Sequence, residues 1–380
     1  MMEALCLAVP TLFGLEGICA EELKRMGAQD VRAENGRVLC EYDPALLVRA
    51  NLCLRTGERV LLRLGRFEAS AFDALFEGVK ALPWEQFIPK DGAFPVQAGH
   101  SLNSALQSIP ACQRIIKKAA ATRLGEVYHI QTLPEMEGLY QIRFSIMKDT
   151  AELFLDTTGP SLHKRGYRAE GVAAPLRETL AAGMVLLSHY RGKDPFRDPF
   201  CGSGTIPIEA ALIAKNRAPG LSRSFAAQRW KSLDKRLWSQ EVDRAKDLEY
   251  HGDYDILGSD IDPKAVSLAK ANARKAGVAD TLRFEEADAT QFAPSEPSGK
   301  VVTNPPYGER LSDRGEAEKL YAAFGRAWRQ MPPGWSLYLL SSHTEFERTF
   351  GRTADKKRKL YNGMLKCDLF QYFDKKGARG

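Results

Sequence analysis

A glycine-rich turn between an apolar strand and an apolar helix constrains the fold of this chain more than any other feature. Residues 196–205 are Phe-Arg-Asp-Pro-Phe-Cys-Gly-Ser-Gly-Thr, and an apolar helical stretch follows at 206–214. Glycine lets the backbone approach a ligand closely, and the N–H groups that begin a helix favour an anion. The pattern predicts a strand–turn–helix unit that holds a carboxylate, with Asp198 beside a neighbouring ammonium group.

Polar residues end each of the next predicted strands. Asp260 and Asp262 follow one strand, Asp288 follows the next, and Asn304 follows a short Val-Val-Thr run. In a doubly wound sheet the carboxyl ends of the parallel strands share one edge, and ligands bind there. The alternation of strands and helices therefore predicts an α/β domain over residues 169–380. A helix cap is the structural alternative for each acid.

Two nucleotide-binding motifs are alternative interpretations of the same turn. Only Gly202 and Gly204 of a G-x-G-x-x-G motif are present, and residues 222–227 lack the acid expected about 20 residues further on. No Gly-Lys-Ser/Thr follows, which excludes a Walker loop. Cys201 lies in the turn without a cysteine-based base-activation motif, so we interpret it as a packing residue and not a nucleophile.

The segment Asn304-Pro305-Pro306-Tyr307 predicts the chemistry at this edge. Two consecutive prolines fix φ and remove two backbone donors, which leaves a rigid loop with a side-chain amide, bare carbonyl groups and an aromatic face. Such a loop can accept hydrogen bonds from the exocyclic amine of a base while the tyrosine stacks on its ring. An ordinary proline turn is the alternative.

Two smaller units precede this domain. Residues 1–60 and 61–155 each alternate strand-like and helix-like segments, which predicts two α+β units, and residues 156–168 form a polar linker. Residues 128–131 are predicted to be a strand of the second unit.

Basic residues gather in several places that suit contacts with RNA phosphates. They occur on one face of a predicted helix, in the linker, in the insertion 215–250 and in a predicted hairpin at 358–373. The insertion mixes basic and aromatic residues, which suits single-stranded RNA, although a helical lid or a simple surface decoration fits equally well. A solvated surface is the alternative for the predicted helix. The candidates are Arg114, Lys117, Lys118, His163, Lys164, Arg165, Arg168, Arg229, Lys359 and Lys366.

Composition limits the class of protein to which these motifs belong. The net charge of +6 is a mild bias toward polyanions. No apolar run approaches the roughly 20 residues of a membrane span, and the first residues lack a secretory signal, so we expect a cytoplasmic protein with no membrane partner. The seven cysteines are scattered and form no C-x-x-C pair, which argues against structural zinc and against a disulfide framework. Oligomeric state cannot be told from the sequence.

The ordered motifs resemble those of class I S-adenosylmethionine (SAM) methyltransferases that modify amino groups of bases. Residues 198–205 match their motif I, and residues 304–307 match motif IV. The preceding layout resembles a ferredoxin-like unit followed by a THUMP domain, which accompanies RNA-modifying enzymes. Over essentially the whole chain the resemblance is to the RlmL-like family, which makes N2-methylguanine in 23S ribosomal RNA. We expect no second methyltransferase domain of the kind fused on in some relatives, so we do not carry over their dual activity.

This resemblance implies roles for particular residues. Asn304, Pro305, Pro306 and Tyr307 would be catalytic, with no metal. Asp260, in preference to Asp262, would contact the ribose, and Asp288 the adenine amino group. The SAM-binding residues implied are Glu178, Thr179, Asp198, Phe200, Cys201, Gly202, Ser203, Gly204, Thr205, Asp260, Ile261, Asp262, Asp288, Ala289 and Asn304.

Three functions stay open at this point. The first is methylation of a guanine N2 in 23S ribosomal RNA, with RNA as the partner. The second is guanine-N2 methylation of transfer RNA or adenine-N6 methylation, because the same turn serves both amines. The third is a non-catalytic RNA-binding protein with a degenerate methyltransferase domain, which the intact Asp198, Gly202, Gly204, Asp260 and Asn304 argue against.

Overall fold

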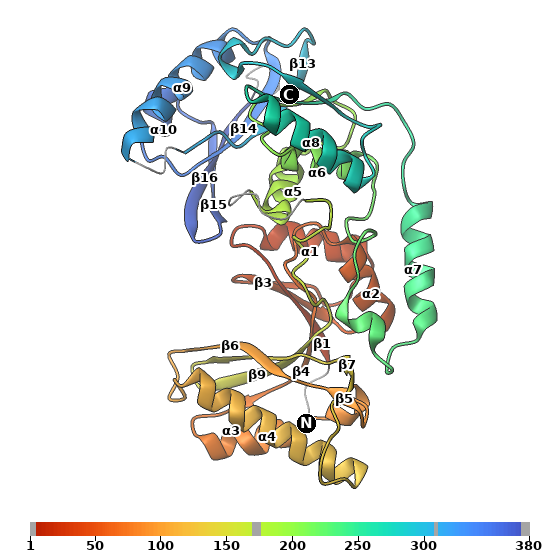
Figure 1. Cartoon of the computed structure of the whole chain (residues 1–380). Helices are drawn as coiled ribbons and strands as arrows, with labels where there is room; N and C mark the ends of the chain where they lie inside the picture. The colour runs from red at the N-terminus through yellow and green to blue at the C-terminus, as the bar shows by residue number, and fades with distance from the viewer. Residues whose placement is uncertain (1–4, 169–175, 308–310, 374–380) are drawn as a thin grey trace. The chain divides into compact units, whose positions relative to one another are not determined.

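The computed structural model describes residues 5–168, 176–307 and 311–373, so the predicted domain start at residue 169 lies outside the described residues. The chain divides into two compact units (Figure 1). Unit 1 comprises Met1–Thr11, Cys19–Leu162 and Arg223–Arg244. Unit 2 comprises Leu12–Ile18, His163–Ser222 and Ala245–Gly380. Both units therefore contain segments from outside the predicted domain boundaries.

One continuous sheet forms the framework of unit 1. Its strand order is β2-β3-β1-β4-β9-β8-β6. The bounds are β1 Cys6–Pro10, β2 Arg32–Glu34, β3 Arg37–Glu41, β4 Leu61–Glu68, β6 Val96–Leu102, β8 Ile142–Met147 and β9 Thr150–Asp156. Strand β4 pairs antiparallel with both β1 and β9. The two predicted α+β units are therefore halves of one sheet, joined through β4.

The first four α-helices of unit 1 include one that overlaps a segment predicted to be a strand. Their bounds are α1 Glu16–Arg25, α2 Pro44–Cys53, α3 Phe72–Lys80 and α4 Ile109–Tyr128, with η1 at Trp84–Gln86 and the short pair β5 Gly92–Ala93 and β7 Glu137–Leu139. Helices α3 and α4 run side by side (Figure 1). The strand predicted at 128–131 is wrong, because α4 continues to Tyr128 and ends at His129 in the left-handed conformation, with φ of 51°.

Unit 2 has the predicted doubly wound sheet. Its strand order is β12-β11-β10-β13-β14-β16-β15. The bounds are β10 Phe196–Asp198, β11 Ile256–Asp260, β12 Arg283–Glu286, β13 Ser298–Thr303, β14 Gly334–Ser341, β15 Lys356–Asn362 and β16 Leu365–Tyr372. Strands β10 to β14 pair in parallel, and β16 joins β14 in the antiparallel direction. The predicted hairpin at 358–373 is confirmed as β15 and β16.

Helices cover both faces of this sheet. Neighbouring strand residues such as Val301 and Val302 belong to different core clusters, because successive side chains of a strand point to opposite faces. Helices α5 Glu178–Leu187, α6 Thr205–Ala214 and α8 Pro263–Ala276 pack in one cluster. Helices α9 Leu311–Arg329 and α10 Phe346–Phe350 pack in the other. Among the described residues no helix is both long and apolar enough to cross a membrane.

The insertion after α6 contributes to the core of unit 1. It contains η2 Ala226–Arg229 and α7 Lys235–Asp247. The indole of Trp230 stacks on Tyr140 with ring centroids 5.2 Å apart, and its N–H donates to the Leu139 carbonyl over 2.9 Å. The ring of Trp238 stacks on Phe225, and both are buried. These aromatic side chains are core residues, so the prediction that this insertion stacks on RNA bases is wrong for them.

We expect Trp230→Ala to lower the free energy of unfolding by about 3–5 kcal/mol, because it empties an almost fully buried site and removes a partly buried hydrogen bond. Thermal unfolding of the full chain and hydrogen exchange in β7 measure the effect. Ser232→Ala, at an exposed position of the same insertion, is the control and should change stability by no more than about 0.5 kcal/mol. Unchanged protection of β7 in Trp230→Ala would contradict the assignment of this segment to unit 1.

Candidate active site

The polar residues predicted to surround a site do meet at one edge of the unit 2 sheet. Strands β11, β10 and β13 lie side by side and in parallel, so their carboxyl ends share this edge. Asp260 is the last residue of β11, Asp198 is the last residue of β10, and Asn304 directly follows β13. Ligands of doubly wound sheets bind at this edge.

Asp198 is a buried carboxylate that the chain satisfies on one side only. Its Oδ1 accepts hydrogen bonds from the Thr303 hydroxyl over 2.6 Å and from the Phe200 N–H over 3.2 Å. Among the described residues, none donates a hydrogen bond to its buried Oδ2. Burial raises the pKa of Asp198 to about 7, against the lowering effect of the Thr303 bond. An unsatisfied carboxylate oxygen of this kind fits a cationic ligand group.

The two glycines of the turn differ in the space available to a side chain. Gly202 has φ of +50°, and within the described part of the chain no atom lies within 4 Å of where a Cβ would stand. Gly204 has φ of +83°, and a Cβ there would lie 2.9 Å from Ala269 and from Phe284. Gly204 therefore permits close packing of the turn on the sheet, whereas Gly202 leaves open space above it.

Asp260 pins the turn to the neighbouring strand. Its Oδ2 accepts a hydrogen bond from the Gly202 N–H over 2.9 Å, and its Oδ1 accepts one from the Asp262 N–H over 3.0 Å. The Cys201 N–H donates to the Ser259 carbonyl over 2.9 Å. Each bonded carboxylate oxygen of Asp260 keeps a second lone pair, so contact with a ribose hydroxyl stays a prediction.

The other two predicted acids act as caps in this structure. Asp262 accepts a hydrogen bond from the Lys264 N–H at the start of α8, and Asp288 accepts one from the Thr290 N–H at the start of η3 Ala289–Gln291. Ile261, between the two edge carboxylates, is 68% exposed. A large exposed apolar side chain at this edge fits the flat face of an aromatic ligand.

The Asn-Pro-Pro-Tyr turn lies directly beside the Asp198 carboxylate, since Thr303 immediately precedes it. The ring of Pro305 is buried and that of Pro306 is exposed. The Tyr307 hydroxyl donates to Asn304 Oδ1, and the Tyr321 hydroxyl of α9 donates to the Pro306 carbonyl over 2.6 Å. Tyr307 is half-buried, and its predicted stacking on a base stays a prediction.

Glu178 and Thr179 are buried at the start of α5. The carboxylate of Glu178 lies 3.2 Å from the Arg168 guanidinium, which in turn donates to the Thr205 hydroxyl over 3.0 Å at the first residue of α6. Burial raises the pKa of Glu178. In this structure Glu178 and Arg168 help to position the first residue of α6, and their predicted contacts with SAM and with phosphate stay predictions.

The predicted RNA-contacting residues differ in their exposure and in their internal contacts. Lys117 pairs with Glu135, Arg165 pairs with Glu209, and Arg168 contacts Glu178 and Thr205. Arg165 is only 3% exposed, so its predicted contact with phosphate is corrected to an internal ion pair. His163 is half-buried. The exposed members are Arg114, Lys118, Lys164, Arg229, Lys359 and Lys366.

Sequence reasoning missed three residues that shape the site. Thr303 bonds to Asp198, Tyr321 bonds to the Pro306 carbonyl, and the Asn272 side chain in α8 donates to the Ser203 carbonyl over 2.9 Å. Asn272 had a detectable signal, because it is a polar residue within the buried, otherwise apolar face of α8. The other two are signalled by no local pattern, since their partners come from tertiary contacts.

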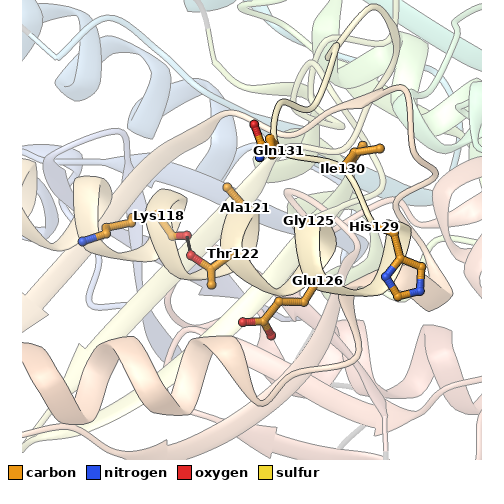
Figure 2. A pocket seen from close by; sticks show the side chains of 8 residues that line it. All are labelled: Lys118, Ala121, Thr122, Gly125, Glu126, His129, Ile130 and Gln131. Atoms are coloured by element: carbon orange, nitrogen blue, oxygen red, sulfur yellow. Dashed lines mark hydrogen bonds between the residues drawn. The ribbon is translucent and has the colours of Figure 1, made fainter.

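A shallow hollow in unit 1 has no such organisation (Figure 2). It lies along α4 and is lined by Lys118, Ala121, Thr122, Gly125, Glu126, His129, Ile130 and Gln131. The Thr122 hydroxyl donates to the Lys118 carbonyl over 2.9 Å, which is a bond within one helix. With charges of both signs, its lining does not define a phosphate site.

Neither a reactive thiol nor a metal cluster is apparent at the candidate site. Burial raises the pKa of the Cys201 thiol well above its usual range, which keeps the side chain protonated at neutral pH. Within residues 5–168, 176–307 and 311–373, no group of His, Cys, Asp and Glu side chains is arranged to hold a metal ion.

Family models match three successive stretches of the chain. Residues 6–61 match an RlmL ferredoxin-like domain, and residues 69–156 match a THUMP domain. Residues 165–371, more than half of the chain, match an RMKL-like methyltransferase domain.

Named relatives share this organisation. The "putative RNA methyltransferase YpsC" of Bacillus subtilis strain 168 is 41% identical over 98% of this chain and 97% of its own. The "ribosomal RNA large subunit methyltransferase K/L" of Syntrophotalea carbinolica is 36% identical over 94% of this chain. The match spans only 52% of that K/L relative, so the chain corresponds to about half of its length.

A solved relative carries the demethylated form of SAM. It is SMU.472, described as a putative methyltransferase complexed with S-adenosylhomocysteine (SAH). It is 40% identical, with a TM-score of 0.93 over 98% of this chain and 99% of its own. SAH has the same amino-acid group as SAM, including its ammonium.

Gly202→Ala and Gly204→Ala should separate ligand binding from folding. We expect Gly202→Ala to cost about 1–2 kcal/mol of stability for its positive φ and to weaken SAH binding at least about tenfold, because the methyl group enters the open space. Gly204→Ala should instead lower the melting temperature more, because of its 2.9 Å contacts. Scanning fluorimetry and titration calorimetry measure both. Unchanged SAH affinity in Gly202→Ala would place the ligand elsewhere.

The affinity for SAM should fall as the pH drops below about 7. Pairing with an ammonium needs an ionised Asp198. Below the raised pKa of Asp198, the ligand-free site holds a proton that must be released when SAM binds. The affinity for SAM therefore falls about tenfold for each pH unit below that pKa. Between the ordinary value of 3.8 and about 7, the folded state binds more protons than the unfolded state, so ligand-free stability falls as pH rises through this window.

Calorimetry at pH 5.5–8.5 tests this expectation. Asp198→Asn is the control, because the amine of the ligand titrates identically with both proteins and only the carboxyl is absent. The variant should bind weakly and with no dependence centred near pH 7. Equal pH profiles for the two proteins would disprove the pairing of Asp198 with the ammonium.

Proposed function

Since the chain belongs to the RMKL-like methyltransferase family and uses SAM, we propose that it methylates RNA at the exocyclic N2 of a guanine in 23S ribosomal RNA. The observation that carries this proposal is the bond between Thr303 and Asp198. It ties the end of β13, where Asn304 begins the turn for an amine, to the carboxylate that fits the cofactor. The relatives named as ribosomal RNA methyltransferases and the matched THUMP domain support RNA as the substrate.

The carboxyl edge of unit 2 would hold SAM through groups that the chain leaves unsatisfied or exposed. Asp198 Oδ2 would pair with the ammonium, and the backbone over Gly202 would leave room for the amino-acid part. Asp260 would accept from the ribose hydroxyls, while Ile261 and Asp288 would contact the adenine. When bound, SAM supplies a methyl group on a positively charged sulfur.

The turn would orient the target amine. The lone pair of the guanine N2 is delocalised into the ring, so the amine is a poor nucleophile. Asn304 Oδ1 and the Pro305 carbonyl would accept its two N–H groups and direct the lone pair toward the methyl group. Positioning of this kind accounts for most of the rate effect when the leaving group is already activated. A base within a helix must first be flipped out, at a cost of a few kcal/mol.

The RNA backbone would follow the exposed basic residues. In unit 1, Arg114 and Lys118 lie four residues apart on α4, and so share one helical face. In unit 2, Lys359 and Lys366 lie on one face of the β15–β16 hairpin, because Lys366 is paired with Tyr361 and Lys359 is two residues from Tyr361. Exposed Lys and Arg side chains on such surfaces suit sequence-independent phosphate contacts.

Product analysis tests the function directly. The protein is incubated with tritiated SAM and total RNA from a strain that lacks its gene, and the labelled nucleoside is identified. We expect N2-methylguanosine in large ribosomal RNA. We expect Asn304→Ala to lower the transfer rate at saturating SAM by about 10²–10³-fold, because it removes an acceptor that acts on the amine.

The other products discriminate the alternatives. Label in transfer RNA would keep the chemistry and change the substrate, and N6-methyladenosine would establish the adenine alternative. Full transfer by Asn304→Ala would overturn the role of the turn. SAM binding without transfer to any RNA, including ribosome assembly intermediates, would favour a non-catalytic RNA-binding protein.

A further inference from the structure

The two prolines of the turn lack backbone donors, and side-chain hydroxyl groups hold the turn instead. Pro305 and Pro306 have no backbone N–H, so the turn cannot be anchored through its own donors at these positions. The Pro306 carbonyl and the Asn304 amide are held by side-chain donors instead. These donors are two phenol hydroxyls, that of Tyr307 at the end of the turn and that of Tyr321 in α9.

Tyr321 holds the backbone of the turn. Its hydroxyl donates to the Pro306 carbonyl over 2.6 Å, and the side chain is only 1% exposed. The ring packs edge-on against Phe346, with centroids 5.0 Å apart, and against His343 at 5.7 Å. Since the ring is enclosed, the hydroxyl has a defined position relative to the carbonyl.

The direction of this hydrogen bond is settled by proton counting. The Tyr321 hydroxyl has one proton, which the Pro306 carbonyl accepts, so the Ser341 hydroxyl 3.4 Å away must be the donor to Tyr321. Ser341 Oγ then accepts from the His343 N–H over 3.1 Å. Each group in this series of hydrogen bonds is therefore a donor to one neighbour and an acceptor from the other in only one way, so the Tyr321 hydroxyl has a single orientation.

Tyr307 holds the side chain of Asn304. Its hydroxyl donates to Oδ1, which identifies the oxygen end of the amide and leaves the second lone pair of that oxygen for a target amine. The Asn362 side chain hydrogen-bonds to the same hydroxyl, and the Cys367 sulfur lies 3.9 Å from it. Both partners belong to the β15–β16 hairpin, so the hairpin sets the position of Tyr307. Burial raises the pKa of both phenols, which keeps them protonated donors at neutral pH.

We propose that Tyr321 and Tyr307 are positioning residues for methyl transfer: their hydroxyls hold the Pro306 carbonyl and the Asn304 amide so that both amine acceptors keep one geometry before the base arrives. The inference rests on the proposed function of the turn. Neither hydroxyl is assigned a contact with the base. Their effect is on the placement of Asn304 and Pro305, where a misplacement of about 1 Å costs about 10²-fold in rate.

Phenylalanine variants isolate the hydroxyl groups. Tyr321→Phe and Tyr307→Phe keep the rings and remove the bonds, and each should lower kcat about tenfold or more while the KM and affinity for SAM stay within about twofold. Tyr372→Phe is the matched control. Tyr372 is buried in the same core cluster as Tyr321, and its hydroxyl also donates to a backbone carbonyl, that of Arg352, over 3.2 Å. It should lose comparable stability and keep the wild-type kcat.

The outcomes separate this inference from the function on which it rests. Wild-type kcat in both Tyr321→Phe and Tyr307→Phe, under conditions where the wild-type protein methylates a base amine, would overturn the positioning role alone. An equal loss of kcat in Tyr372→Phe would also overturn it, because the effect would then be one of general stability. A wild-type protein that methylates no RNA amine would overturn the proposed function and, with it, this role.

Discussion

The hydrogen bond between the Thr303 hydroxyl and the Asp198 carboxylate is the interaction on which the site depends. It links the ends of two neighbouring parallel strands, β10 and β13, in a region where both side chains are almost fully buried. A buried polar group without a partner costs free energy, so each of these two groups fixes the other. Through this bond, the glycine turn after β10 and the proline turn after β13 keep a constant separation.

Local patterns predicted the parts of the fold that are determined within a short stretch of chain. The glycine turn, the strand-ending acids and the hairpin at 358–373 each depend on a short stretch of consecutive residues, and the structure contains all of them. Long-range pairing lies beyond such patterns. Strand β4 looks like the start of a separate unit, and only its pairing with both β1 and β9 shows that the first two predicted units share a sheet.

The same limit explains which site residues could be anticipated. Asp198 and Asp260 are the last residues of their strands and Asn304 directly follows one, so their place at the carboxyl edge is implied by parallel order. The residues that hold these turns in place, by contrast, come from helices through tertiary packing. Asn272 in α8 bonds to the glycine turn, and Tyr321 in α9 bonds to the proline turn. Basic residues were the least predictable, because a sequence shows that Arg165 is charged but not that Glu209 neutralises it in the interior.

The exchange of segments between the two units has a consequence for the order in which the protein folds. Tyr140 and Leu139 are made early, yet their partner Trp230 lies 91 residues beyond Leu139. At the usual rate of synthesis this interval lasts roughly 5–18 s, during which the aromatic surface around Tyr140 is uncovered. Unit 1 therefore finishes folding only after the first part of unit 2 has emerged, and no single cut in the chain would release either unit intact.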